Sequence, residues 1–305
     1  MKVAGFGVVC SSCLAMTAET LDPAAAEALR RLLDDTSPQV REALVEEFRR
    51  LGNPGITFLR ETAETGGGEL APHARRFLRE LGGEDTVSTF LEFIRSFQYE
   101  METGMLLLER SVYPGVGVVD THGFLDSVAT RCRQLMLTPS SAREKCLVLS
   151  RVLFHENGFR GDAENYHNPL NSFLHYVIRR RRGIPLTLSV LYILVGMRCG
   201  IELEPVALPG RFMAGCFQDD EPFFIDAYER GVFRNEDDLR GYFRHLEMPF
   251  DPAAMMPAPV GEVLARCCRN LVNQYTASRD HTRAKLFAEF VHEFELAYKR
   301  HAEPN

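Results

Sequence analysis

The sequence predicts a mostly helical α+β protein with one small antiparallel sheet. Apolar residues recur at helical spacing through most of residues 21–200, and strand-like runs follow within residues 203–227. Two more helical stretches close the chain. Because the strands follow one another along the chain, this order favours an α+β fold over alternating βαβ units.

The first helical part, residues 21–96, is predicted to hold several short helices. Asp22 and Ser37 each precede a proline, a pairing that is typical of a helix start, with the first residue as the N-cap. Gly52 is expected to end the second helix. Residues 32–44 resemble one HEAT repeat, so we expect stacked helix pairs that serve either as a binding surface or as a packing appendage.

Residues 100–160 are predicted to continue as helices. Ser141 and Glu144 have the spacing of a capping box, which indicates a helix start, and Gly158 is expected to end that helix.

Two further helices are predicted before the strands. The first covers residues 171–182, with the Asn171-Ser172 pair as its cap and Gly183 as its end. The second covers residues 185–199, with Pro185 at its first position.

The strand-like runs predict the small antiparallel sheet. The three runs are Leu203–Leu208, Phe212–Phe217 and Pro222–Ala227. A helix is predicted over residues 236–245, and a linker rich in Pro and Ala over residues 251–260. Residues 261–277 and 280–302 are predicted to form a closing helical hairpin.

Composition places the chain among ordinary globular proteins. Its 305 residues suffice for two domains and for a large core without disulfides. Hydrophobic residues make up 45% and charged residues 25%, which excludes a fully disordered chain. The net charge of −7 argues against a surface devoted to nucleic acid. No apolar run approaches the ~20 residues of a membrane helix, so we expect no membrane partner.

The chain has eight cysteines, and six of them lie in or beside apolar patterns. That placement predicts reduced, buried thiols and a cytoplasmic location. Cys10 and Cys13 form a single CxxC without a second pair or a spaced His pair, so we expect no metal and no cofactor. Residues 1–20 are interpreted as disordered, or alternatively as a weak signal peptide because Lys2 precedes the apolar Val3–Val9.

Five sequence blocks in the central part of the chain resemble one known family. They are Leu153–Gly161, Asn168–Leu174, Arg181–Tyr192, Leu208–Phe212 and Phe224–Asp226. Together they are similar to the bacterial Sir-B-type branch of the transglutaminase-like superfamily, and the resemblance covers residues 100–290. It implies a papain-like transglutaminase core at residues 100–250 and a tetratricopeptide-like tail, here reduced to one helical hairpin at residues 258–305.

The resemblance also implies where the catalytic triad of the superfamily would lie. Its cysteine opens a helix, its histidine lies on a following strand, and its aspartate lies on the next strand. The position of the cysteine is taken by Pro185, because the segment Gly183-Ile-Pro185 opens a helix that ends at Gly200-Ile201. Asp226 matches the aspartate, and Arg211 stands fifteen residues earlier, at the position of the histidine.

Two of the three triad positions therefore lack the chemistry that the reaction needs. Proline offers no nucleophile, and arginine cannot act as a base near neutral pH. We expect acyl transfer by this triad to be absent and Asp226 to form an ion pair with Arg211. The candidates for a relocated nucleophile are Thr187, Ser189 and Cys216. The alternative for each is structural, as a hydroxyl bonded to the backbone or as a buried strand cysteine.

The densest run of positive charge is Arg179–Arg182. One interpretation is structural, because arginines at the C-terminal end of a helix stabilise its last carbonyl groups. The other is a ligand site in which Arg181 and Arg182 join Arg211 to bind a carboxylate, a phosphate or an acidic peptide.

Three functions remain open at this point. The first, which we expect, is a non-catalytic interaction module whose altered cleft binds a protein, a peptide or a small anion. The second is an acyltransferase or hydrolase of the same fold with a relocated nucleophile. The third is a nucleic-acid-associated protein that uses the arginine run, which the net negative charge disfavours.

Overall fold

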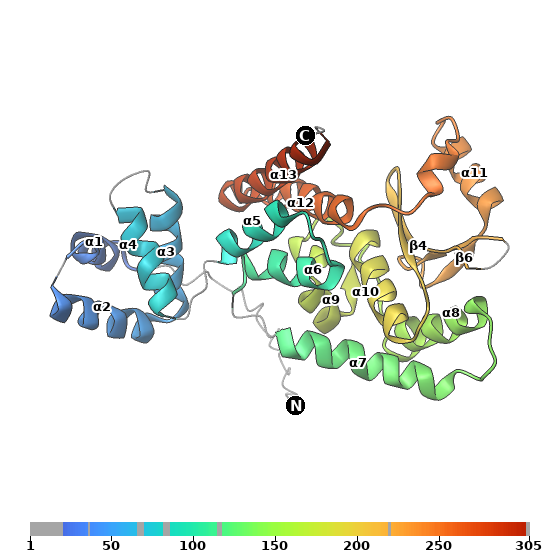
Figure 1. Cartoon of the computed structure of the whole chain (residues 1–305), viewed down its shortest axis with the longest axis horizontal. Coiled ribbons are helices and arrows are strands. Elements are labelled where there is room, and N and C mark those ends of the chain that lie inside the picture. The colour runs from blue at the N-terminus through green and yellow to red at the C-terminus, as the bar shows by residue number, and fades with distance from the viewer. Residues whose placement is uncertain are drawn as a thin grey trace, which may run out of the picture. The chain divides into compact units, whose positions relative to one another are not determined.

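The computed structural model describes residues 21–35, 37–65, 70–81, 86–114, 118–218 and 221–302 (Figure 1). The chain divides into two compact units, the first ending at Asp85 and the second beginning at Thr86. Each unit has its own hydrophobic core. The interpretations of residues 1–20, including the Cys10–Cys13 pattern, lie outside the described residues.

The described part of the first unit consists of four short helices, which confirms the prediction of helices here. They are α1 (Pro23–Leu32), α2 (Pro38–Leu51), α3 (Asn53–Thr65) and α4 (Leu70–Glu80). The ring of Phe48 lies in their common core, 6.2 Å from the ring of Phe58 and 5.6 Å from that of Phe77. The HEAT repeat itself stays a prediction.

The predicted N-caps of the first two helices are correct in position but not in bonding. Asp22 and Ser37 each precede the proline that opens a helix, yet neither side chain accepts a hydrogen bond from a backbone amide of the first turn. The Ser37 hydroxyl is instead hydrogen-bonded to Gln39 Oε1 at 2.9 Å. Proline at the first position already supplies the helical φ angle, so these helices start without a side-chain cap.

The second unit begins with α5 (Thr86–Ser96), which the sequence pattern assigns to the N-terminal segment. In the structure α5 packs against α6 (Met101–Arg110) and α13 (His281–Ala302). The ring of Phe90 meets that of Phe290 edge-on at 4.9 Å. The division of the chain therefore falls at residue 85 and not at residue 96, because partners far along the chain decide where α5 belongs.

The next helices are α7 (Val118–Leu135) and α8 (Ala142–Ser150), and α8 continues into a π-helical turn, η1 (Arg151–Glu156). The predicted capping box at the start of α8 is confirmed. The Glu144 amide donates to Ser141 Oγ at 3.2 Å, and the Ser141 amide donates to Glu144 Oε2 at 2.8 Å.

The helix predicted over residues 171–182 is wrong at both ends. Pro169–Ser172 forms a short 3-10 helix, η2, and α9 covers only Leu174–Arg180. Arg181 ends α9 in the left-handed conformation, with φ of 57°. Left-handed backbone ends many helices and usually calls for glycine, so the arginine there gives no local signal of the helix end.

The predicted cap of this helix is also wrong. Asn171 donates to a backbone carbonyl earlier in the chain at 2.8 Å, and Ser172 Oγ donates to Gln274 Oε1 at 2.8 Å. The first turn of α9 bonds instead to Glu109 of α6, whose Oε2 accepts from the His175 amide at 3.0 Å. A carboxylate is favourable at that end of a helix.

The central helix of the second unit is α10 (Pro185–Arg198), as Figure 1 shows. Every residue from Leu186 to Gly196 is buried, because α7, α8, α9 and the sheet pack around it. A helix that is apolar on all sides is expected to lie inside the protein. Pro185 takes the first helical position as predicted, and Gly200, with φ of 67°, follows its end.

The main sheet has four antiparallel strands in the order β3–β4–β5–β6 (Figure 1). They are β3 (Glu204–Leu208), β4 (Arg211–Cys216), β5 (Phe223–Asp226) and β6 (Val232–Arg234). The first three agree with the predicted runs, whereas β6 was not predicted. One face of the sheet packs on α10, and the other face packs on α11 (Glu236–His245) through Val206 and Phe224. A separate parallel pair joins β1 (Arg160–Gly161) to β2 (Arg182–Gly183).

The C-terminal hairpin consists of α12 (Val260–Ala277) and α13, as predicted. A short 3-10 helix, η3 (Pro252–Met255), lies in the segment predicted as a linker. Side chains of α12 and α13, such as Leu271 and Phe287, belong to the same hydrophobic core as α10, so the hairpin completes the second unit. Within the described ranges, no helix is both long and apolar enough to cross a membrane.

Candidate functional site

The three triad-equivalent positions lie on elements that pack together. Pro185 is the first residue of α10, Arg211 is the first residue of β4, and Asp226 is the last residue of β5. Ser189, one turn into α10, donates its hydroxyl proton to the Phe212 carbonyl at 3.1 Å and so joins the helix to β4. The helix and the two strands are thus arranged as the resemblance implies.

The predicted ion pair between Arg211 and Asp226 is confirmed. Arg211 Nη1 lies 3.0 Å from Asp226 Oδ2. The Asp226 side chain is 3% exposed, and its Oδ1 also accepts from the Glu229 amide at 3.2 Å. Burial raises the pKa of Asp226, while the Glu229 amide and the Arg211 guanidinium oppose that rise. Arg211, at the position of the catalytic base, is therefore paired with Asp226, at the position of the aspartate that orients the histidine in the superfamily.

Arg211 combines this pairing with access to solvent. Its side chain is 32% exposed, and its guanidinium lies 5.0 Å above the ring of Tyr242. Such a cation–π contact orients a guanidinium and leaves its outer N–H groups available to a ligand.

The turn that precedes β4 is held from two sides. Arg266 of α12 donates from Nη2 to the carbonyls of Leu208 and Arg211, each at 2.9 Å. Tyr242 of α11 donates to the Pro209 carbonyl at 2.7 Å. These bonds fix the backbone of Arg211. Sequence reasoning missed both clamping residues, because no local pattern distinguishes them from other residues of an amphipathic helix.

One tyrosine, Tyr242, lies against Arg211, and two further tyrosines contact each other. The rings of Tyr166 and Tyr228 meet edge-on at 6.3 Å, and Tyr242 lies under Arg211. Burial raises the pKa of Tyr228 and of Tyr242, so both phenols keep their protons at neutral pH. The positive charges of Arg211 and Arg266 act on the pKa of Tyr242 in the opposite sense to burial.

We refer to these five side chains as the arginine–tyrosine cluster. Its members are Tyr166, Arg211, Tyr228, Tyr242 and Arg266. Glycine is needed beside it at position 161, because a Cβ there would lie 2.4 Å from the Tyr228 ring. Because Tyr242 and Arg266 donate to backbone carbonyls, the cluster offers a ligand mainly the partly exposed guanidinium of Arg211 beside aromatic surface, which is a chemistry of binding.

The candidate substitute nucleophiles are all buried. Thr187, Ser189 and Cys216 each have a solvent exposure of 0%. The Ser189 proton is engaged by the Phe212 carbonyl. Thr187 Oγ1 has no hydrogen-bond partner among the described residues, but it is enclosed within α10 and its neighbours. Cys216 belongs to the core between the sheet and α10.

The arginine run does not form one helical surface. Arg179 and Arg180 end α9, Arg181 is left-handed, and Arg182 lies on β2. Arg180 pairs with Asp162 at 3.5 Å.

Arg181 lies in an aromatic environment of its own. Its guanidinium lies 4.5 Å from the ring of Phe124 and 4.6 Å from that of Phe159, and burial lowers its pKa. Neither ring takes part in the contacts of Arg211, which are to Tyr242 and Asp226. A joint ligand site of Arg181, Arg182 and Arg211 therefore stays a prediction.

Comparisons with known proteins agree with this architecture. Residues 120–269 match the family model of the Transglutaminase-like superfamily. That segment contains all three triad-equivalent positions. No solved structure shows a significant match.

Several curated relatives are also similar to this chain. A UPF0162 protein of Xylella fastidiosa (strain 9a5c) is 32% identical over 196 residues, which are 61% of this chain and 68% of that protein. A UPF0162 protein of Vibrio cholerae serotype O1 is 24% identical over 130 residues, which are 42% of this chain and 48% of that protein. F-box only protein 21 of Mus musculus is 36% identical over 81 residues, which are 27% of this chain and 13% of that protein. The chain therefore belongs to the UPF0162 family, and its central part is a domain of the transglutaminase-like superfamily.

Proposed function

We propose that this protein is a non-catalytic member of its superfamily and that the arginine–tyrosine cluster binds a peptide segment carrying carboxylates. The observation that carries the proposal is the ion pair at the former catalytic position. Arg211 stands where the base belongs and neutralises Asp226 at 3.0 Å, while Pro185 stands where the nucleophile belongs. We also propose that the protein belongs to the Sir-B-type branch, that its C-terminal hairpin is tetratricopeptide-like, and that it is located in the cytoplasm.

The loss of both reacting groups supports the absence of acyl transfer. In comparable triads, removal of the nucleophile or the base costs several orders of magnitude in turnover. The substitutes Thr187, Ser189 and Cys216 are enclosed in the core, where no peptide substrate reaches them.

The preference for a carboxylate ligand follows from the donors. The partly exposed guanidinium of Arg211 presents a planar fork that matches a carboxylate, and the Tyr242 ring beside it adds apolar contact. Arginine and tyrosine are also the residue types that carry much of the binding energy at protein interfaces. The segment shared with F-box only protein 21 covers 13% of that protein, which supports the use of this fold as one module of a larger chain.

The proposal is tested by binding and by activity on the full chain. Fluorescence anisotropy would compare a labelled glutamate-rich peptide with a lysine-rich peptide of equal length. We expect the first to bind and Arg211→Gln to weaken its binding by about tenfold or more, as for the loss of a charged hydrogen bond. Arg269→Gln is the matched control, since Arg269 lies on α12 near Arg266 in sequence but pairs with Glu262 on the surface. Equal binding by both variants would contradict the proposal.

Activity is measured as amine incorporation into a glutamine peptide. We expect no signal above that of denatured protein, and none from Arg211→His, because Pro185 still offers no nucleophile. Robust turnover that Ser189→Ala or Cys216→Ala abolishes would support the alternative, an acyltransferase or hydrolase with a relocated nucleophile.

A further inference from the structure

Two cysteines lie side by side where the C-terminal end of α10 meets α7. Cys199 directly follows α10, and its Sγ lies 3.7 Å from the Ala129 carbonyl of α7. Cys132 lies three residues after Ala129 on α7, so the Ala129 contact brings Cys199 to the turn of the helix that carries Cys132, and the two thiols affect each other's pKa. Cys199 is partly exposed, whereas Cys132 is fully buried. An oxidant from solvent therefore meets Cys199 before it can reach Cys132.

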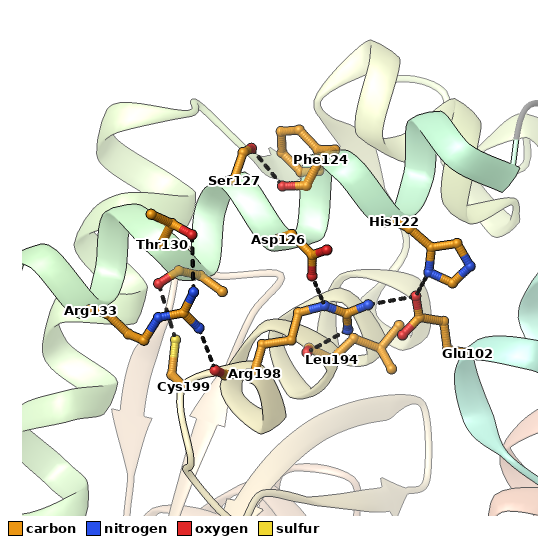
Figure 2. Close-up of polar contacts among 11 residues, drawn as sticks. Glu102, His122, Phe124, Asp126, Ser127, Thr130, Arg133, Leu194, Arg198 and Cys199 are labelled. Atoms are coloured by element: carbon orange, nitrogen blue, oxygen red, sulfur yellow. Dashed lines mark hydrogen bonds and ion pairs between the residues drawn. The ribbon is translucent and has the colours of Figure 1, made fainter.

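The charge around Cys199 favours its thiolate. Arg133 donates from Nη1 to the Arg198 carbonyl at 2.7 Å, next to Cys199 (Figure 2). Cys199 follows the C-terminal end of α10, and the free carbonyl groups at that end of a helix disfavour an anion. The interaction with the Cys132 thiol and, less strongly, the charge of Arg133 lower the pKa of Cys199, against the effect of burial.

Ion pairs beside the thiols hold the same elements together. Arg198 lies 2.8 Å from Asp126 of α7 and 2.8 Å from Glu102 of α6 (Figure 2). His122 Nδ1 lies 2.6 Å from the same Glu102 oxygen. These ion pairs fix the end of α10, which directly precedes Cys199, on the helix that carries Cys132.

We propose that Cys132 and Cys199 form an oxidation site at which a peroxide converts the two thiols into a disulfide. The Cys199 thiolate attacks one peroxide oxygen, the O–O bond breaks, and hydroxide leaves. The sulfur is thereby oxidised to a sulfenic acid and the peroxide is reduced. The Cys132 sulfur then attacks the Cys199 sulfur, the S–O bond breaks, and the Cys132 proton leaves with the hydroxide as water. A dithiol reductant restores both thiols.

The test uses the full chain carrying Cys10→Ser and Cys13→Ser, so that every remaining cysteine belongs to the described part. The protein is treated with hydrogen peroxide, alkylated, digested and analysed by mass spectrometry. We expect a cross-linked peptide that joins Cys132 to Cys199. We also expect the Tm to rise by about 5–10 °C and dithiothreitol to reverse the rise, because the bond closes a long loop.

Two variants separate the chemistry from simple proximity. In Cys132→Ser, we expect Cys199 to stop at the sulfenic acid, which dimedone traps, and in Cys199→Ser we expect Cys132 to stay reduced. Reduced Cys199 in both the parent and Cys132→Ser after peroxide would overturn the proposal, and so would a cross-link between other cysteines.

The role of the charge is tested by alkylation of Cys199 with iodoacetamide. We expect Arg133→Gln to slow this reaction several-fold. Arg131→Gln is the matched control, because Arg131 lies on the same helix but pairs with Glu156 at 2.9 Å. Equal rates in the two variants would overturn the assignment of Cys199 as the attacking thiolate.

Discussion

The two ends of α10 present opposite chemistry. At the N-terminal end, where the superfamily places its nucleophile, stands Pro185, and Arg211 and Asp226 nearby neutralise each other. At the C-terminal end, Cys199 is a partly exposed thiol beside the cationic Arg133. The helix dipole alone would favour a thiolate at the first end and disfavour it at the second. The comparison teaches that the immediate neighbours of a side chain, more than its place on a helix, decide its reactivity.

The largest expected effect concerns the reactivity of the thiols themselves. Burial raises the pKa of Cys267 to about 12, whereas the pKa of Cys199 lies below its usual 9.0. At pH 8 we expect Cys199 to react with iodoacetamide at least about a thousandfold faster than Cys267, since thiolate fraction sets the rate. Competitive alkylation of the native protein, read by mass spectrometry, measures the ratio. Comparable alkylation rates for Cys199 and Cys267 would show that the thiol at the end of α10 is no more reactive than a thiol in the core.

The next effect compares two buried carboxyl groups. Asp226 forms an ion pair with Arg211. Glu109 Oε2 accepts a hydrogen bond from the His175 amide, whereas Glu109 Oε1 has no hydrogen-bond partner among the described residues. Burial raises the pKa of Glu109 to about 7 from the usual 4.5. The folded protein then holds a proton that the unfolded chain releases between these values. The contribution of Glu109 to the free energy of unfolding therefore falls as the pH rises from 4.5 to 7.

Glu109→Gln should remove this dependence. Relative to the parent, we expect the variant to gain roughly 3 kcal/mol of unfolding free energy between pH 4.5 and pH 8. Urea unfolding at a series of pH values measures the difference. A constant difference across that range would show that Glu109 does not titrate in this window.

A smaller effect is expected at the former catalytic position. Arg211→Ala leaves the buried Asp226 without its cation, which we expect to cost about 1–3 kcal/mol, because water reaches the partly exposed arginine site. Arg211→Met combined with Asp226→Asn should cost less, since asparagine keeps the acceptor for the Glu229 amide. Arg240→Ala, which breaks a surface pair with Glu236, should stay within about 0.5 kcal/mol of the parent. An unchanged unfolding midpoint for Arg211→Ala would show that Arg211 is not structural.

The smallest effect is expected at the first residue of α10. Proline fits this position because its φ angle is helical and the first amide has no partner within the helix. We expect Pro185→Ala to cost about 0.4–1 kcal/mol, mainly through the entropy of the unfolded chain. A loss of several kcal/mol in denaturant unfolding would mean that Pro185 carries packing that no other residue can replace.

Features that depend on local pattern could be predicted from the sequence. The capping box at Ser141, the start of α10 at Pro185 and the first three strands of the main sheet follow from short signals. The Arg211–Asp226 pair followed from the chemistry of two residue types at positions implied by a family resemblance.

Features that depend on distant partners could not be predicted. The start of α9 bonds to Glu109, which lies on a different helix, and its end is a left-handed Arg181. Strand β6 is only three residues long and is defined by its pairing with β5. The clamps from Tyr242 and Arg266 reach the turn before β4 from two separate helices. For the start of α9 and for the two clamps, the partner atom lies more than thirty residues away in the sequence.

The packing of α12 has a consequence for which fragments of this chain can fold. The segment that matches the superfamily ends at residue 269, which lies inside α12. The same helix clamps the turn beside Arg211 and contributes to the core around α10. A gene duplication or fusion that copied only the matched segment would encode an incomplete α12 and would leave the core around α10 partly uncovered. We therefore expect a stably folded fragment of the second unit to extend beyond the segment that matches the superfamily and to include the C-terminal hairpin.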